Sequence, residues 1–125
     1  MTSGSLDTKN HRFLRRIGYA WKGVRAAWKT EASFRTQGWS ALAALSFLLT
    51  TRPPPIWWAI VTVISAAILA AELFNTALEA LMDVVHPELH PLIGKAKDCA
   101  SGAVLVLSVG ALLVFAAILW ETWRV

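Results

Sequence analysis

The chain has 125 residues, of which 56% are hydrophobic, and it carries a formal net charge of +4. Stretches of about twenty residues without a charge argue against an ordinary soluble domain, which has no need of them. The single cysteine, Cys99, excludes an intramolecular disulfide.

The N-terminal part is predicted to lie on a membrane surface. Residues 1–8 are small and polar and are expected to be a disordered lead-in. Residues 9–30 are predicted to form an amphipathic helix, in which Phe13, Ile17 and Trp21 share one face and basic side chains take the flank and the far side. A basic face opposite aromatic residues is typical of a helix in the membrane surface. Nucleic-acid binding would also explain the basic charge, but the apolar face and the adjoining apolar segments disfavour it.

Three transmembrane helices are predicted next, over about residues 34–51, 55–83 and 92–120. The second contains most of a run of nineteen uncharged residues from Pro53, and the third contains the 22-residue run that ends at Trp120. Each run is long enough to cross the hydrocarbon core at about 1.5 Å per residue. Prolines end the first two helices. The sequence therefore predicts an all-α membrane protein with one domain over residues 1–125.

The distribution of charge predicts the orientation. From Lys9 to Arg35 there are eight basic residues and one acid, whereas Arg52 is the only charge between the first two spans. Lys95 and Lys97 precede the third span. The positive-inside rule then places the N-terminus in the cytoplasm and the C-terminus on the opposite side. Tryptophans at the outer span ends fit this orientation as interfacial anchors: Trp57, Trp58, Trp120 and Trp123.

A polar stripe runs along the second span from the point where its uncharged run ends. Glu72, Asn75, Glu79 and Asp83 lie at about 0°, −60°, −20° and +20° around a helix. Ionisable groups at this depth are costly, so they are candidates for function, facing a protein interior or a polar cavity. Three acids and an amide on one stripe could bind hydrated magnesium and move a proton. The simpler explanation, a solvated helix end, remains open, above all for Asp83.

Two further groups of charges each allow two interpretations. Glu31 is the one acid in a basic segment, and an ion pair with Arg35 four residues later would be its simplest role. Lys97 and Asp98 could reflect membrane orientation and an acid at a helix start, or a phosphate-binding lysine with its partner. The sequence has no Walker-type glycine loop, so any ATP site must be built from scattered charges.

Four segments of this chain carry a family resemblance: Gly18–Gly23, Glu31–Arg35, Glu72–Glu79 and Ala96–Asp98. In their order and spacing they resemble the small integral-membrane diacylglycerol kinases of bacteria, over about residues 12–120. The resemblance implies ATP-dependent phosphorylation of the primary hydroxyl of diacylglycerol to give phosphatidic acid. It also implies a homotrimer in the bacterial inner membrane, with active sites shared between neighbouring subunits and a periplasmic C-terminus.

The resemblance further implies roles for individual residues. Glu72 corresponds to the catalytic base, and Glu31 and Glu79 to the residues that hold Mg²⁺ with the nucleotide. Nucleotide contacts are implied for Arg12, Tyr19, Glu31, Glu79, Glu88, His90, Lys97 and Asp98. Contacts with the lipid substrate are expected from Trp21, Arg25, Ser33, Arg35, Glu72, Asn75 and Ser101.

Three alternatives to a diacylglycerol kinase remain. The first is an undecaprenol kinase, because Ser101–Leu105 resembles the polyprenol-kinase branch, although Trp21–Gly23 and Glu31–Arg35 favour diacylglycerol. The second is a small proton-coupled transporter in which Glu72 carries the proton. The third is a non-catalytic membrane adaptor that uses the basic surface helix.

Overall fold

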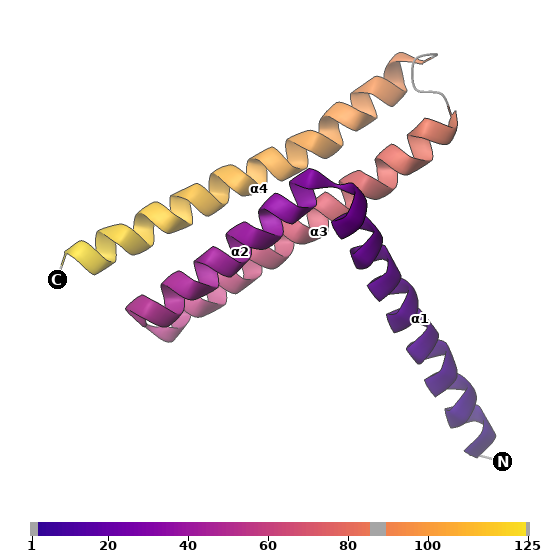
Figure 1. Ribbon diagram of the computed structural model, residues 1–125, viewed down its shortest axis with the longest axis horizontal. Helices are drawn as coiled ribbons and strands as arrows, with labels where there is room; N and C mark the ends of the chain where they lie inside the picture. Colours follow the sequence, from indigo (N-terminus) through magenta and orange to yellow (C-terminus); the bar gives the residue numbers. More distant parts are fainter. Residues whose placement is uncertain (1–2, 86–89, 125) are drawn as a thin grey trace.

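A computed structural model describes residues 3–85 and 90–124, with side chains from Thr8 onward. The described residues form four α-helices, α1 (Ser3–Thr30), α2 (Ala32–Thr51), α3 (Pro55–Val85) and α4 (Pro91–Trp123). Helix α3 is central, because it contacts each of the other three. Helices α2, α3 and α4 form a bundle, and α1 projects from its side (Figure 1). The predicted all-α architecture is confirmed.

The N-terminal helix is longer than the sequence predicted. It begins at Ser3, whereas the sequence predicted a helix from about residue 9. Once a helix is nucleated, adding a residue costs little, and no proline interrupts this segment. The apolar face of α1 stands away from the bundle, and Phe13, Ile17 and Trp21 are each at least half exposed.

A sharp elbow joins α1 to α2 at one residue. Glu31 is extended, with φ −108° and ψ 109°, and helix resumes at Ala32. Nη1 of Arg35 donates to the carbonyls of Trp28 (2.7 Å) and Lys29 (3.1 Å), which satisfies two carbonyls at the end of α1. Arg35 therefore closes the elbow, and the expected ion pair between Glu31 and Arg35 is not found among the described residues.

Aromatic side chains fill the inside of this elbow. The Trp28 ring makes edge contacts with Phe34 (6.2 Å between centroids) and Trp39 (5.8 Å). It also lies directly over Gly38, where an added Cβ would come within 2.6 Å of a Trp28 ring carbon. Only glycine allows this close approach, so the elbow angle depends on Gly38.

Two of the three predicted spans meet the length and hydropathy expected of a membrane helix. These are α3, with 31 residues, and α4, with 33. Helix α2 has 20 residues but falls short of that hydropathy because polar side chains occupy its first two turns. It ends at Arg52, whose left-handed backbone (φ 46°) turns the chain into the prolines before α3.

Helices α2, α3 and α4 also contact one another toward Pro55 and Trp120. Leu48 and Ile118 are almost fully buried there, and Phe47 meets Phe115 edge to face at 5.5 Å. Nε1 of Trp57 donates to Oε2 of Glu121 at 2.6 Å, which links the start of α3 to the end of α4.

Candidate active site

Glu72 is the most deeply buried charged residue of the described chain. Its side chain is 3% exposed, in the middle of α3 and beside the elbow. The hydroxyl of Ser33, in the first turn of α2, donates to its Oε2 at 3.1 Å. Burial of a carboxylate away from water is costly unless partners compensate for it. This one hydrogen bond therefore leaves Glu72 a strong candidate for chemistry.

The polar stripe predicted for this helix continues along α3. Nδ2 of Asn75 donates to Oε1 of Glu79 at 3.3 Å. Oδ1 of Asn75 is enclosed and has no hydrogen-bond partner. A buried polar atom without a partner is uncommon in a folded protein and marks a place where a ligand can supply one. Asn75 thus connects the buried Glu72 region with the more open Glu79.

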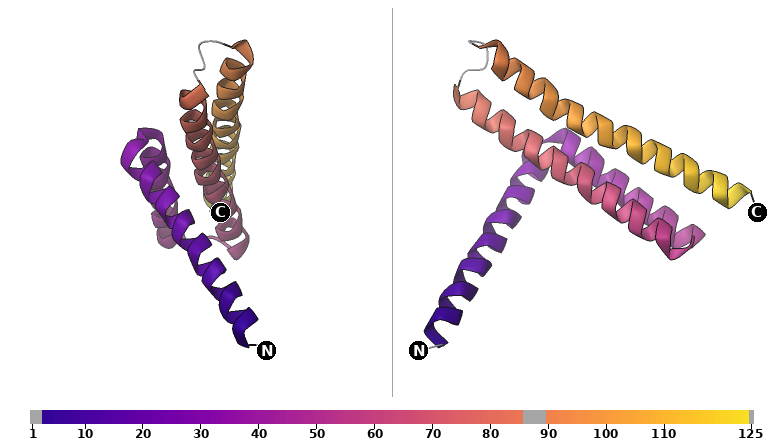
Figure 2. Two further views of the ribbon diagram at one scale, coloured as in Figure 1. Left: turned by 90° about the vertical axis from the view of Figure 1, so that its right-hand side faces the viewer. Right: turned by 180° about the vertical axis from the view of Figure 1, so that it is seen from behind.

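A groove opens between α1 and the second half of α3, and Glu79 and Asp83 of the stripe lie in its wall. Its volume is about 710 Å³, and alanine and glycine make up nearly half of its lining. Three carboxylates line it, those of Glu31 at the elbow and of Glu79 and Asp83 on α3. Figures 1 and 2 show α1 diverging from the second half of α3. The structure brings Glu31 and Glu79 of one chain to the same groove.

This arrangement fits a magnesium ion held together with phosphate groups. No three His, Cys, Asp or Glu side chains of the described residues cluster closely enough to hold a metal ion unaided. Mg²⁺ is usually held by one or two carboxylates, with waters and substrate phosphates completing its shell. Glu31 and Glu79 are therefore suitable ligands for Mg²⁺ bound to a nucleotide.

The predicted nucleotide contacts on α1 do not line the groove. Arg12 and Tyr19 are exposed on the projecting part of the helix, where Nζ of Lys22 lies 5.7 Å from the centre of the Tyr19 ring. Trp21 and Arg25, predicted to contact lipid, are also exposed and absent from the groove lining. A ligand would have to extend along α1, or a second chain would have to approach, for these residues to join the site.

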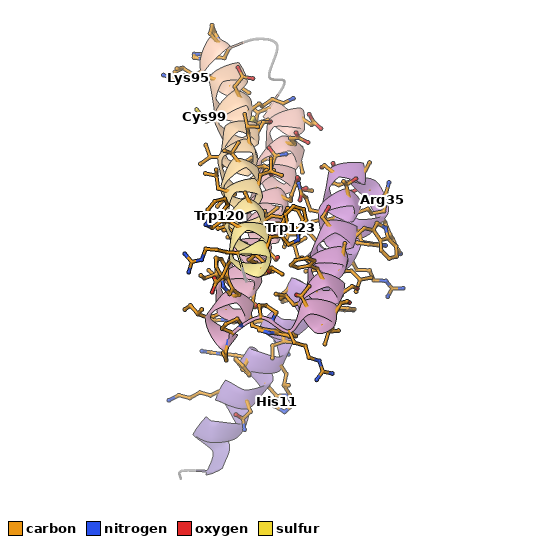
Figure 3. The ribbon with its side chains drawn as sticks, turned by 90° about the vertical axis from the view of Figure 1, so that its left-hand side faces the viewer. His11, Arg35, Lys95, Cys99, Trp120 and Trp123 are labelled. Carbon is orange, nitrogen blue, oxygen red and sulfur yellow. The ribbon has the colours of Figure 1, made fainter. Side chains whose placement is uncertain are left out.

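The predicted contacts on α4 are also separate from the groove. Lys97 is half-buried, Asp98 and Ser101 are exposed, and none of the three side chains bonds to another described residue. Nδ1 of His90 accepts from the Leu92 amide at 3.1 Å and so caps α4. Glu88 lies outside the described residues. Figure 3 shows Lys95 and Cys99 on the side of α4 that faces away from α2.

Two residues of the site were missed by the sequence analysis. Thr30 lines the groove, donates to the carbonyl of Ala26 at 3.0 Å, and has its hydroxyl oxygen 3.4 Å from Oε1 of Glu31. Thr76 lines the groove and donates to the backbone carbonyl of Glu72 at 2.9 Å. Thr76 falls one helical turn after Glu72, and this spacing could have identified it.

The fold and the site are those of a helical membrane enzyme, and comparison with known proteins identifies its class as a lipid kinase. Residues 18–119 match the family model described as prokaryotic diacylglycerol kinase. The chain belongs to this family, which confirms the resemblance seen in the sequence.

Individual relatives include kinases with two different lipid acceptors in their names. The chain is 35% identical over 110 residues to the diacylglycerol kinase of Escherichia coli K12, covering 88% of this chain and 90% of that protein. It is 32% identical over 109 residues to the undecaprenol kinase of Bacillus subtilis, covering 83% and 89%. The diacylglycerol kinase of Helicobacter pylori J99 is 29% identical over 109 residues, covering 87% and 81%. Membership of a kinase family implies use of ATP, and it leaves the acceptor lipid to be assigned.

Proposed function

We propose that this protein transfers the γ-phosphoryl group of ATP to the primary hydroxyl of diacylglycerol and so forms phosphatidic acid and ADP. The observation that carries the proposal is the position of Glu72, which is buried on α3 about 10 Å along the helix from Glu79 in the acid-lined groove. A base at hydrocarbon depth beside a phosphate-binding groove at the surface suits a lipid hydroxyl and a water-soluble donor.

In the proposed reaction Glu72 accepts the proton of the lipid hydroxyl. The hydroxyl oxygen attacks the γ-phosphorus, the bond to the β-phosphate bridging oxygen breaks, and ADP leaves with the electron pair. Glu31 and Glu79 would hold Mg²⁺ with the nucleotide, and the ion supplies charge neutralisation of the phosphates. Phosphoryl transfer needs positioning and charge neutralisation more than covalent catalysis. A base and two magnesium ligands therefore provide the types of group that the reaction requires.

Diacylglycerol is the acceptor favoured by the sequence segments at the site. Trp21–Gly23 and Glu31–Arg35 resemble the diacylglycerol branch, and relatives with that name include the Escherichia coli enzyme. Undecaprenol is the second candidate, supported by the Bacillus subtilis relative and by the segment Ser101–Leu105. The two acceptors call for the same base and groove and differ in their hydrocarbon contacts.

The proposed assembly is a homotrimer in the cytoplasmic membrane. In this proposal α2, α3 and α4 all cross the membrane, α1 lies on its cytoplasmic surface, and the C-terminus is periplasmic. A shared active site would explain why Lys97 and Asp98 on α4 are absent from the groove of their own chain. They, with Arg12 and Tyr19, could then contact a nucleotide bound at the Glu31 and Glu79 of another subunit.

The test is phosphate transfer from γ-labelled ATP by the purified protein in mixed micelles. Diacylglycerol and undecaprenol are supplied in parallel, with and without Mg²⁺. Magnesium-dependent label in phosphatidic acid is the expected result. Label confined to the polyprenol product would reassign the acceptor and keep the site. Absence of transfer to either lipid by a folded trimer would overturn the proposal and favour the transporter.

A further inference from the structure

Ser33 differs from every other hydroxyl residue of α2 in its hydrogen bond. The others donate to the carbonyl four residues earlier in the same helix, and they are Thr36, Ser40, Ser46, Thr50 and Thr51. The Ser33 hydroxyl donates instead to Oε2 of Glu72, 39 residues away on α3. Its hydrogen bond thus serves the buried carboxylate and not its own backbone.

The elbow explains this difference. The carbonyl four residues before Ser33 belongs to Lys29, at the end of α1, and the extended residue Glu31 separates it from α2. That carbonyl accepts a hydrogen bond from Arg35 at 3.1 Å. Ser33 therefore lacks the backbone acceptor that hydroxyl residues use inside a helix. Its hydroxyl therefore donates to Glu72 on α3 instead.

The two carboxylate oxygens of Glu72 are in different surroundings as a result. Oε2 accepts from Ser33, whereas Oε1 has no donor among the described residues. Among the described residues, Asn75 alone has a fully enclosed side-chain oxygen without a hydrogen-bond partner. Oε1 of Glu72 also lacks a partner, so it is not fully enclosed. One oxygen is held by a hydrogen bond, and the other has no hydrogen-bond partner and retains some accessible surface.

We propose that Ser33 is a positioning residue that holds Oε2 of Glu72 and thereby directs Oε1 toward the acceptor hydroxyl. This inference rests on the proposed role of Glu72 as the base. The lipid hydroxyl proton passes to Oε1, and the Ser33 proton stays on its own oxygen throughout. Because a carboxylate can rotate about its Cγ–Cδ bond, a fixed Oε2 limits the directions that Oε1 can take. Misplacement of a reacting group is costly in rate, even when binding is unaffected.

The first experiment compares Ser33→Ala with Ser33→Thr by steady-state kinetics in mixed micelles with γ-labelled ATP and diacylglycerol. Ser33→Ala is expected to lower kcat about tenfold, the order expected for loss of one hydrogen bond to a charged group. The KM values for ATP and for diacylglycerol should change less than twofold. Ser33→Thr retains the hydroxyl and should recover most of the rate. Ser46→Ala, on the same helix, removes a hydroxyl bonded only within α2 and should leave kcat unchanged.

A higher KM for diacylglycerol with an unchanged kcat in Ser33→Ala would overturn the positioning role and make Ser33 a lipid contact only. A loss of activity shared equally by Ser33→Ala and Ser33→Thr would also overturn it. Circular dichroism and thermal unfolding of both variants show that the compared proteins are folded.

A second experiment repeats Ser33→Ala in a Glu72→Gln background. If Ser33 acts through Glu72, the double variant should have the same residual rate as Glu72→Gln alone. A further tenfold loss would overturn the inference and leave the base intact. Near-normal activity of Glu72→Gln itself would remove the base assignment and the inference with it, so the two failures are distinguishable.

Discussion

The two ends of the α3–α4 pair are built differently. At the Trp57 end, a hydrogen bond to Glu121 joins the helices, and Leu48 of α2 and Ile118 of α4 are buried nearby. In the half of α3 from Glu72 to Val85, called the Glu72 end below, lie a buried carboxylate, an amide oxygen without a partner and one wall of the open groove. One end satisfies its own side chains, and the other leaves carboxylates and an amide free to meet ligands.

This contrast predicts that one part of α3 mainly determines the stability of the fold and another part mainly determines catalysis. Substitutions at the Trp57 end should change the free energy of unfolding and spare activity, and substitutions at the Glu72 end should do the reverse. Substitutions at Gly38 are expected to have intermediate effects, because Gly38 packs tightly against Trp28 at the elbow that positions the groove.

The largest effect is expected for Glu72→Gln. Loss of a general base typically reduces the rate by about 10²–10⁴-fold. The amide is nearly the same size and can still accept from Ser33, so thermal unfolding in detergent should be little changed. Glu121→Gln at the Trp57 end is the matched control and should keep full activity. A rate for Glu72→Gln within tenfold of wild type would contradict the prediction that catalysis depends on the Glu72 end.

The next effect is expected for Glu79→Gln and Glu31→Gln at the groove. Each removes one proposed magnesium ligand, so Mg²⁺ affinity should fall about tenfold or more. Activity measured against Mg²⁺ at fixed ATP should shift to higher metal concentration in both variants. Gln37→Ala, on α2 and outside the groove lining, is the control and should leave the Mg²⁺ dependence unchanged. A loss of activity in Glu79→Gln that does not depend on Mg²⁺ concentration would remove the metal role.

Gly38→Ala should destabilise the elbow by about 1–3 kcal/mol, because its Cβ would come within 2.6 Å of the Trp28 ring. Thermal unfolding in detergent measures this loss. Gly102→Ala is the control, since a Cβ there meets nothing within 4 Å and should leave the unfolding temperature unchanged or higher. Adding Trp28→Leu to Gly38→Ala should recover part of the loss by removing the overlapping ring. Equal unfolding temperatures for the two glycine variants would contradict the close contact.

The smallest effect is expected for Trp57→Phe, which keeps an aromatic ring and removes the donor to Glu121. The free energy of unfolding should fall by about 1 kcal/mol, the usual net value of one hydrogen bond. Phosphate transfer should be unchanged. Trp58→Phe serves as the control, because its indole has no hydrogen bond among the described residues. A loss of activity in Trp57→Phe with normal unfolding would show that the two ends are not independent.

The sequence was sufficient to predict the helices and the polar stripe, because both depend on local periodicity. Long runs of apolar residues predicted the helices α3 and α4, and a spacing of three to four residues placed Glu72, Asn75 and Glu79 on one face. The start of α1 at Ser3 was missed because a polar segment that continues a helix has no apolar pattern of its own.

The contacts between helices could not be predicted from local patterns. The bond from Ser33 to Glu72 joins residues 39 positions apart, and it depends on the angle at which α2 meets α3. The role of Arg35 was also different from the simplest expectation, since its guanidinium reaches back to α1 and not to Glu31. Both contacts follow from the elbow, whose angle depends on the close approach of Trp28 to Gly38.

The one-residue elbow also has a mechanical consequence. Helix α1 is a rigid arm of 28 residues, about 42 Å long, and Glu31 sits at its pivot. Because displacement grows with distance from a pivot, a swing that moves the far tip of the arm by several ångströms moves the Glu31 carboxylate by only a fraction of one. The Glu31 carboxylate therefore keeps its place at the groove edge even where the far end of the arm is displaced.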